Sequence, residues 1–433
     1  MYIIGKTGTG KSTLLESMIV SDIEEGEGLA VLDPHGDSFE KLLNYIPEER
    51  LEDVVIFDPS DLQFPVAMNM LELFDPDQIG LVASGLVDVF RRRFEFSWGP
   101  RLEHILRNCL LTLLHIPHST LLGVTRLLTD RAYRKYITHL LPDPVLKDFW
   151  EVEFEGMADS KSLVAEAISP IQNRLGQFLS TPTIRNIVGQ PRSTIKLDEI
   201  INTRKILLVN LSKGKIGEDN SAILGGMLIS RLQFAAMTRV SLPPEERKDF
   251  FVYVDEFQNF ATSAFASILS EARKYRLNLI LAHQYLAQVP EEVRTAIFGN
   301  VGSIISFSVG QADASILAKE FAPTFDESDL IGLEKYHIYL KLMIDLSQSR
   351  PFSARTLPFD VVETGLREKV IASSRSKYAA DRSEVESRIV RWSRKQFVPG
   401  MDDKVVEKLR KELETKAAAA KKPAAEFPGE QNP

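Results

Sequence analysis

The chain has 433 residues, of which 44% are hydrophobic and 26% are charged, and its formal net charge is −8. This length exceeds that of one compact domain and suits one large core with an inserted or appended piece. The acidic balance excludes a general nucleic-acid-coating surface, so any contact with DNA or RNA has to be confined to a groove or channel lined by a few Lys and Arg.

The single cysteine, Cys109, lies inside an apolar run and is expected to be a small buried hydrophobic residue. One cysteine cannot build a disulfide framework, which favours a reducing compartment. No apolar run approaches the roughly 18 residues of a membrane span, and we recognise no signal peptide. The chain as given is expected to be soluble. Because Met1 falls directly at the first predicted strand, an upstream membrane anchor or a missing first domain stays open as an alternative.

The first stretch, Met1 to Thr13, predicts a short apolar strand, a glycine-rich turn and the start of a helix. Its spacing Gly-x-x-x-x-Gly-Lys-Ser matches the P-loop pattern, in which the lysine reaches the β/γ-phosphates and the serine binds magnesium. The glycines let the backbone turn several N–H groups toward an oligophosphate. The predicted nucleotide-binding residues are Gly5, Lys6, Thr7, Gly8, Thr9, Gly10, Lys11, Ser12 and Thr13.

Apolar strands and helices alternate after this motif. Strands are predicted at residues 29–32 and 54–57, with a helix from about Ser38 to Asn44 between them. This alternation is typical of an α/β fold. Asp33 and His35 follow the first of these strands and are expected near the phosphates, because open α/β sheets place ligands at the carboxyl ends of their strands.

From residue 75 to about 163 the periodicity is helical without convincing strands, which predicts an all-helical insertion. The insertion carries a basic and aromatic cluster, in which Arg91–Arg93 are followed by Phe94, Phe96 and Trp98. Such a cluster is consistent with phosphate contact and stacking on a nucleic-acid strand. A solvated helix end beside a small core explains the same residues and is the preferred interpretation.

The chain then returns to the α/β pattern with a buried strand at residues 205–211 and a polar loop at 212–219. The loop carries two lysines and two glycines at a carboxyl end of a strand. Two interpretations of this loop stay open, contact with phosphate and a plain solvated connection.

The strand at residues 250–254 ends in Asp255-Glu256, which supplies the acidic partner that a P-loop needs. Asp255 is predicted to hold magnesium through water, and Glu256 to orient and deprotonate the water that attacks the γ-phosphate. We expect adjacent strands to bring the P-loop and these carboxylates together.

A further buried strand at residues 277–282 is followed by Gln284, which is expected beside Asp255 and is predicted to sense the γ-phosphate. The helical segment before this strand contains Arg273 and Arg276. Either arginine could reach the nucleotide of a neighbouring subunit and offset charge in the transition state. Ordinary helix salt bridges are the alternative for both.

These motifs together resemble the ATPases of the FtsK–HerA superfamily, and among them the TraD/TraG-like coupling proteins of type IV secretion and conjugation. The resemblance covers about residues 1 to 360. It rests on the P-loop, on Asp255-Glu256, and on the segments Glu271–Tyr275, His283-Gln284, Asp33–Gly36, Asn300–Ala314 and Thr356–Pro358, together with the helical interruption.

The resemblance implies an α/β fold with a RecA-like P-loop NTPase core, a mainly parallel sheet and an inserted all-α domain. The first part of the core is expected at residues 1–73 and the insertion at 74–163. The second part of the core, with the acidic strand, sensor and arginine finger, is expected at 164–363, and a helical, partly disordered tail at 364–433.

The implied activity is that of an ATP-driven DNA translocase that uses ATP and Mg²⁺ and acts as a homo-hexameric ring. Single- or double-stranded DNA is the expected substrate, and secretion-channel or relaxosome proteins are possible further partners. In this assignment Lys11, Glu256, Gln284 and Arg273 are catalytic, with Lys11 on the phosphates, Glu256 as base, Gln284 as sensor and Arg273 acting in trans. Ser12 and Asp255 hold the magnesium ion.

Coupling proteins usually begin with a transmembrane anchor, and this sequence contains none. The expected location is therefore the cytoplasm, with peripheral attachment to the inner face of the cell membrane as an option. Two other functions stay open. A motor for protein substrates fits the acidic balance at least as well as a DNA motor does, and a nucleotide-dependent switch would need no useful turnover.

Overall fold

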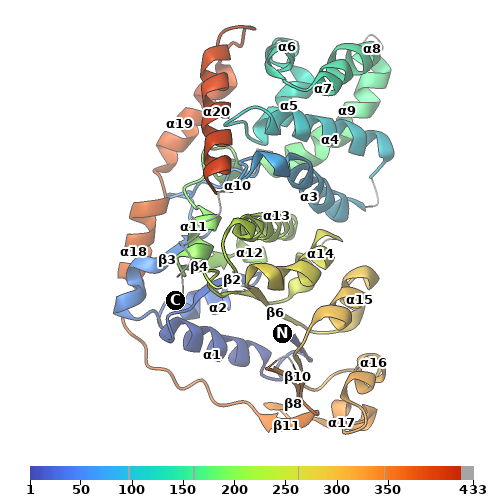
Figure 1. Cartoon of the computed structure of the whole chain (residues 1–433), viewed down its shortest axis with the longest axis vertical. Helices are drawn as coiled ribbons and strands as arrows, with labels where there is room; N and C mark the ends of the chain where they lie inside the picture. The colour runs from blue at the N-terminus through green and yellow to red at the C-terminus, as the bar shows by residue number, and fades with distance from the viewer. Residues whose placement is uncertain (96–97, 159–160, 262, 346, 421–433) are drawn as a thin grey trace, which may run out of the picture. The chain divides into compact units, whose positions relative to one another are not determined.

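The computed structural model describes residues 1–95, 98–158, 161–261, 263–345 and 347–420 (Figure 1). The chain folds into two compact units, each of which draws on several segments of the sequence. Unit 1 consists of Met1–Ser60, Glu199–Ile229 and Lys248–Tyr378, and unit 2 of Asp61–Asp198, Ser230–Arg247 and Ala379–Pro433. The domain boundaries given above stay predictions.

Unit 1 is built on a sheet that has nine strands in the described residues. The two strands at one edge, β11 and β8, run antiparallel, and β8 is also antiparallel to β7, whereas every other neighbouring pair is parallel. The predicted mainly parallel sheet is thereby confirmed. The order across the sheet is β11 (Phe352–Arg355), β8 (His337–Lys341), β7 (Ile304–Ser306), β1 (Tyr2–Ile4), β6 (Leu277–His283), β5 (Phe250–Val254), β2 (Gly28–Asp33), β4 (Ile206–Asn210) and β3 (Val54–Phe57).

Helices and short 3₁₀ turns connect these strands, as the α/β pattern predicts. A small hairpin of β9 (Met343–Ile344) and β10 (Ser347–Gln348) lies outside the main sheet. The helices are α1 (Lys11–Glu24), α2 (Asp37–Leu42), α11 (Leu197–Asn202), α12 (Lys213–Ile216), α13 (Glu218–Met237), α14 (Ser263–Glu271), α15 (Glu291–Asn300), α16 (Gln311–Phe321), α17 (Glu327–Gly332) and α18 (Arg367–Tyr378). The 3₁₀ turns are η1 (Glu48–Asp53), η6 (Phe257–Asn259), η7 (Ala272–Tyr275) and η8 (Leu286–Gln288).

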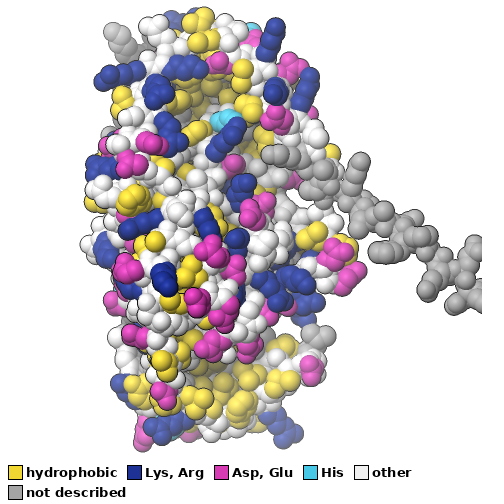
Figure 2. Space-filling model, turned by 90° about the vertical axis from the view of Figure 1, so that its left-hand side faces the viewer, with side chains coloured by type: hydrophobic (Ala, Val, Ile, Leu, Met, Phe, Trp, Pro, Cys, Tyr) yellow, Lys and Arg dark blue, Asp and Glu magenta, His cyan; other side chains and the backbone are white. Residues whose placement is uncertain are grey.

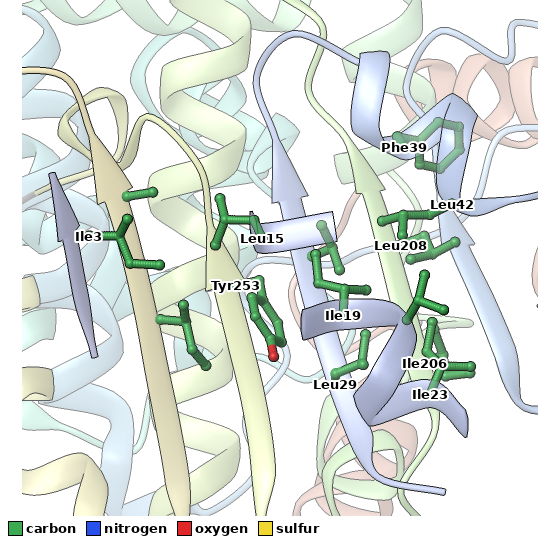
Figure 3. Close-up of a cluster of buried hydrophobic side chains, with 14 of the residues drawn as sticks. Ile3, Leu15, Ile19, Ile23, Leu29, Phe39, Leu42, Ile206, Leu208 and Tyr253 are labelled. Atoms are coloured by element: carbon green, nitrogen blue, oxygen red, sulfur yellow. The ribbon is translucent and has the colours of Figure 1, made fainter. Parts of the chain in front are cut away.

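One face of the sheet is covered by α1, α2 and α18, and Figure 3 shows the centre of this core. Leu15, Ile19 and Ile23 follow one another at intervals of four residues, so they share one side of α1 and pack toward the strands. Every second residue of a strand points to the same face of the sheet, so the strand residues that contact α1 are two positions apart. These partners include Ile3, Leu29, Ile206, Leu208 and Tyr253, and α2 adds Phe39 and Leu42.

Unit 2 is helical in its described residues, apart from one isolated bridge between Val66 and Ala379. The inserted all-α part of the predicted fold is thereby confirmed. Its elements are η2 (Pro76–Gln78), α3 (Ile79–Arg93), α4 (Pro100–Leu114), α5 (Leu122–Thr129), α6 (Arg131–Leu140), α7 (Pro144–Asp148), the π-helical turn η4 (Phe149–Phe154), α8 (Glu155–Ala158), α9 (Lys161–Ser180), α10 (Pro182–Val188), η5 (Thr238–Ser241), α19 (Arg382–Arg394) and α20 (Asp403–Ala420). Cys109 of α4 is fully buried, as expected, and burial raises the pKa of its thiol.

The basic and aromatic cluster at the end of α3 makes contacts with other residues of unit 2. Phe94 is buried, Arg91 forms ion pairs with nearby carboxylates, and the Trp98 Nε1–H donates to Glu103 Oε2 at 2.7 Å. Phe96 lies outside the described residues. These contacts favour the interpretation of this segment as a helix end beside a local core.

Charged side chains of both signs are interspersed on the face of the molecule shown in Figure 2. This distribution agrees with the expectation that the acidic chain has no general basic coating surface. Within the described residues, none of the helices is both long and apolar enough to cross a bilayer. Residues 421–433 of the predicted tail lie outside the described residues.

The buried faces of the central strands should dominate the stability of unit 1. Leu208 of β4 is 0% exposed, whereas Leu357, which follows β11, is 80% exposed. Leu208→Ala is expected to lower the free energy of unfolding by about 2–5 kcal/mol, because it removes buried methyl groups and leaves a cavity. The matched change Leu357→Ala should alter it by less than about 0.5 kcal/mol. Denaturant unfolding of both variants checks this, and equal losses would contradict the assignment of the core.

Candidate active site

The P-loop follows β1 and has the backbone that its glycines permit. Gly8 and Gly10 have φ of 79° and 119°, a region that residues with a Cβ rarely adopt. At Gly5 a Cβ atom would come within 2.5 Å of the Cβ of Phe307, so only glycine fits there. Gly10 caps α1 without a side-chain hydrogen bond, which leaves the first amides of this 14-residue helix to bind an anion.

Lys11 is buried and crosses the inside of this loop. Its Nζ donates to the backbone oxygens of Gly5 at 2.6 Å and Lys6 at 3.1 Å. Burial lowers the pKa of Lys11, and the carboxylates of Glu256 and Asp255 oppose this effect. The predicted lysine and the predicted acidic pair are therefore close enough to interact. Ser12 is exposed beside Lys11, at the start of α1.

The acidic pair follows β5. The backbone N–H of Glu256 donates to Asp255 Oδ1 at 2.9 Å, and Glu256 has a φ of 45°, in the left-handed region. Burial and the neighbouring Glu256 raise the pKa of Asp255 to about 6, Asp33 adds to this increase, and Lys11 opposes it. The carboxylates of Asp255 and Glu256 thus concentrate negative charge, which a bound cation would relieve.

Magnesium fits this donor set. No cluster of three or more His, Cys, Asp or Glu side chains suited to a metal ion occurs in the part of the chain that the structure describes. Mg²⁺ does not need such a cluster, because it is usually held by one or two carboxylates together with phosphate oxygens and waters. Ser12 and Asp255 could supply a hydroxyl and a carboxylate of this kind.

Gln284, at the end of β6, contacts the predicted base directly. Its Nε2 donates to Glu256 Oε1 at 2.8 Å, and the Nε2 of Gln258 donates to Glu256 Oε2 at 2.6 Å. Asn259 Nδ2 donates to the backbone oxygen of Glu256 at 2.7 Å. Gln258 and Asn259 were not predicted, and their only signal in the sequence is their position directly after the acidic pair.

The expectation that the P-loop strand and the acidic strand are neighbours is wrong. Strand β6 lies between them, with Leu281 opposite both Tyr2 of β1 and Val254 of β5. The parallel strands nevertheless end at the same edge of the sheet, so the P-loop, Gln284 and the acidic pair converge there. The expected position of the Gln284 strand beside the Asp255 strand agrees with this order.

His283, directly before Gln284, is the last residue of β6. It is fully buried, its Nε2 shares a hydrogen bond with the Tyr2 hydroxyl, and burial lowers its pKa to about 3. Its imidazole is therefore neutral and packs against the rings of Tyr2 in β1 and Phe257 in η6. It contributes to the support of the P-loop strand.

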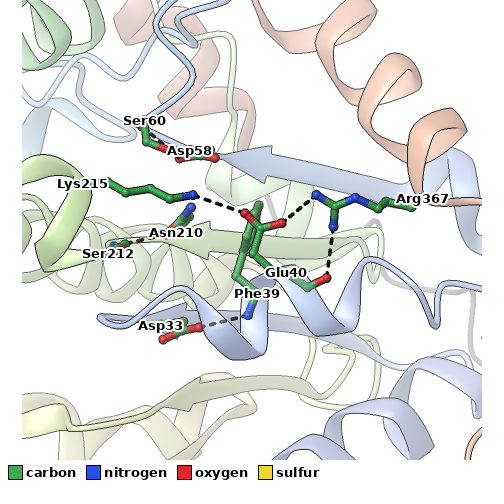
Figure 4. A network of polar contacts seen from close by, with 9 residues as sticks. All are labelled: Asp33, Phe39, Glu40, Asp58, Ser60, Asn210, Ser212, Lys215 and Arg367. Atoms are coloured by element: carbon green, nitrogen blue, oxygen red, sulfur yellow. Dashed lines mark hydrogen bonds and ion pairs between the residues drawn. The ribbon is translucent and has the colours of Figure 1, made fainter.

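Asp33 has a structural role in the turn that begins α2. Its carboxylate accepts hydrogen bonds from the N–H groups of His35 at 2.8 Å and Phe39 at 2.9 Å (Figure 4). Asp33 nevertheless lies near enough to affect Asp255 electrostatically, as described above. His35 is exposed.

The prediction of a loop at residues 212–219 is wrong in part, because Lys213–Ile216 forms the short helix α12 and α13 begins at Glu218. Both lysines of this connection bind side chains of unit 1. Lys213 Nζ donates to Asn259 Oδ1 at 2.7 Å, and Lys215 Nζ lies 3.3 Å from Glu40 Oε1. Glu40 also pairs with Arg367 at 2.6 Å (Figure 4). These contacts favour the interpretation of the loop as a connection, and Lys213 additionally links it to the turn that carries Glu256.

The two candidate finger arginines differ in their surroundings. Arg276 pairs with Asp249, with 3.0 Å between Nη1 and Oδ2, which is the salt bridge considered as an alternative. Arg273, in η7, is exposed, and its side chain makes no hydrogen bond or ion pair with another described residue. It precedes the seven-residue strand β6, whereas Gln284 follows it. An extended strand of this length separates its ends by about 20 Å, so Arg273 lies far from the P-loop of its own chain.

Comparisons with known proteins bear on the family and the fold of this chain. A family model described as the central domain of helicase HerA matches residues 1–231. The plasmid coupling protein TrwB has a similar structure in complex with the ATP analogue ADPNP, with a TM-score of 0.60, 14% identity, and coverage of 84% of this chain and 87% of TrwB. For TrwB with ADP and Mg²⁺ the TM-score is 0.60 and the identity 13%, at the same coverage.

VirB4 of Thermoanaerobacter pseudethanolicus is also similar, with a TM-score of 0.53, 12% identity, and coverage of 83% of this chain and 90% of VirB4. No protein with a curated description matches the chain significantly. At these identities the structural matches show a shared fold, whereas the family model covers more than half of the 433 residues. The chain therefore belongs to the family of the helicase HerA central domain, within the FtsK–HerA superfamily of P-loop ATPases, as its motifs indicate.

Proposed function

We propose that the protein is an ATP-driven DNA translocase of a type IV secretion or conjugation-like DNA transfer system, and that it acts as a hexameric ring. The observation that carries this proposal is the meeting of Lys11, Asp255, Glu256 and Gln284 at one edge of the sheet. The descriptions of similar structures support it, since TrwB is a conjugative coupling protein with complexes of ADPNP and of ADP with Mg²⁺. Secretion-channel or relaxosome proteins are the proposed partners.

In the proposed mechanism, residues Gly5 to Thr13 bind the phosphates of ATP. Lys11 exchanges its bonds to the Gly5 and Lys6 carbonyls for the β/γ-phosphates, so that the buried ammonium gains an anionic partner. Ser12 and Asp255 would hold magnesium. When bound, this ion offsets the charge of the phosphates.

Glu256 acts as the general base and accepts a proton from the attacking water. Gln284 senses the γ-phosphate by exchanging its hydrogen bond to Glu256 Oε1 for one to a phosphate oxygen. ATP binding therefore frees one oxygen of the Glu256 carboxylate, which can then accept the proton of the attacking water.

Arg273 acts on the nucleotide of a neighbouring subunit. The exposure of Arg273, the lack of a side-chain hydrogen bond or ion pair with described residues, and its distance from its own P-loop all support a role in trans. A guanidinium at the γ-phosphate would offset charge that develops in the transition state. Ring assembly would then be a condition for full activity.

A second candidate function is a secretion motor for protein substrates. The net charge of −8 and the interspersed surface charges of Figure 2 favour it, because they show no broad basic surface for DNA on that face. Stimulation by DNA distinguishes the two functions.

Steady-state ATP hydrolysis is expected to rise with added single- or double-stranded DNA at low salt, and to rise cooperatively with protein concentration. The stimulation should weaken as salt increases, because phosphate contacts release counterions. Lys11→Ala should abolish hydrolysis under every condition. Hydrolysis that depends on Lys11 but is indifferent to DNA would favour the motor for protein substrates.

Glu256→Gln is expected to retain ATP binding while its kcat falls by about 10²- to 10⁴-fold, the usual contribution of a general base. The measurement pairs ATP affinity, from fluorescent-nucleotide titration, with the hydrolysis rate. A variant that binds ATP and hydrolyses it as fast as wild type would exclude Glu256 as the base and favour a nucleotide-dependent switch with little turnover.

Arg273→Ala is expected to lower kcat on the order of 10³-fold, as the loss of an arginine finger does. The control is Arg276→Ala, which removes an arginine of the same segment that is paired with Asp249 and should keep most of the activity. A mixture of Arg273→Ala and Lys11→Ala subunits should regain part of the wild-type rate. The Arg273→Ala subunit has an intact P-loop, and the neighbouring Lys11→Ala subunit supplies the arginine. A mixture that assembles without any gain would contradict the role in trans.

A further inference from the structure

Gln258 contacts the proposed base with one end of its amide and leaves the other end without a partner. Its Nε2 donates to Glu256 Oε2 at 2.6 Å, while its buried Oε1 accepts no hydrogen bond from any residue in the described part of the chain. A buried acceptor without a partner is unfavourable, so a donor that enters the site would be stabilised there. Because Oε1 and Nε2 belong to one amide, this donor would also lie beside the Glu256 carboxylate.

The turn that carries Gln258 is fixed by several hydrogen bonds. The backbone N–H and the side-chain Nδ2 of Asn259 both donate to the Glu256 carbonyl, at 3.0 and 2.7 Å. Asn259 Oδ1 in turn accepts from Lys213 Nζ at 2.7 Å. These contacts hold Glu256 at its positive φ, and they set the position from which Gln258 reaches the carboxylate.

We infer that Gln258, together with Glu256, positions the water that attacks the γ-phosphate; this inference rests on the proposed ATPase function. A water molecule has two O–H groups and therefore needs two acceptors to be oriented. Glu256 accepts one O–H and Gln258 Oε1 accepts the other, which leaves a lone pair of the water oxygen directed at phosphorus.

The reaction step balances with these two residues. The water oxygen forms a bond to the γ-phosphorus, and the proton of one O–H passes to the Glu256 carboxylate. The bond between the γ-phosphorus and the bridging oxygen breaks, and ADP leaves with the electron pair. The second O–H stays on the phosphate product and remains donated to Gln258 Oε1 until release.

Gln258 also complements the proposed sensor. Gln284 and Gln258 hold different oxygens of Glu256, so the carboxylate loses one partner when Gln284 turns to the γ-phosphate. Gln258 then keeps the base oriented while the water is in place. The Gln284 amide thus contacts the nucleotide, and the Gln258 amide contacts the attacking water.

The test replaces Gln258 with methionine, which has a similar length but neither donates nor accepts strongly. Gln258→Met is expected to lower kcat by about 10²-fold, the lower end of the usual contribution of a group that acts on the proton being transferred, with ATP affinity and KM unchanged. The control is Gln311→Met. Gln311 makes the same kind of bond in α16, from Nε2 to Glu327 Oε2 at 2.8 Å, and its replacement should leave kcat unchanged.

A double-mutant cycle separates this role from general support of the fold. In a Glu256→Gln background, Gln258→Met should lower the residual rate no further, because both residues act on one water. Wild-type kcat in Gln258→Met, or the same fold-loss in both backgrounds, would overturn the inference. Should Gln258→Met not fold, Gln258→Asn, whose amide is one methylene too short, is measured in the same way.

The proposed function and this inference fail in different ways. Hydrolysis that requires Lys11 and Glu256 but is indifferent to Gln258 overturns the inference alone. Hydrolysis that survives Lys11→Ala and Glu256→Gln overturns both.

Discussion

Parallel pairing of β6 with β1 on one side and β5 on the other is the interaction on which the site depends. These strands carry few polar side chains and are buried, so their charged residues are confined to the ends. Because the three strands run the same way, their carboxyl ends meet at one edge and bring a lysine, an amide and two carboxylates together. No long-range folding of loops is needed to assemble these groups, and the positions of their backbones are set by the ladder of hydrogen bonds.

Burial makes the charged groups of the site dependent on their hydrogen-bond partners. Lys11 is 6% exposed and Glu256 is 7% exposed, and each would be costly to bury alone. In the described structure the ammonium is satisfied by backbone carbonyls and the carboxylate by two glutamine amides. Neutral partners of this kind can be exchanged for charged ones. The site is therefore satisfied as described, and in the proposed function these neutral partners give way to phosphate and magnesium.

Local sequence was sufficient to predict the elements that have a strong local signal. The spacing of Gly5, Gly10 and Lys11 predicts the turn and helix of the P-loop, and continuous apolar runs predict the buried strands. The order of these strands is set by pairings between distant segments, which is why β6 was not expected between β1 and β5. Gln258 was missed for a related reason, since a lone glutamine after an acidic pair has no periodicity and gains meaning only from the atoms around it. The pairing of Arg276 with Asp249 likewise depends on tertiary structure.

The left-handed backbone at Glu256 also affects which substitutions stabilise the protein. A side chain with a Cβ is unfavourable at φ of 45°, and glycine would be accommodated there with less strain. Substitutions that relax this turn would therefore make the folded state more robust while they remove the carboxylate. In the proposed mechanism Glu256 is the base, so selection for thermal stability and selection for turnover would act in opposite directions at this position. A search for stabilised variants that ignores activity would then favour inactive proteins.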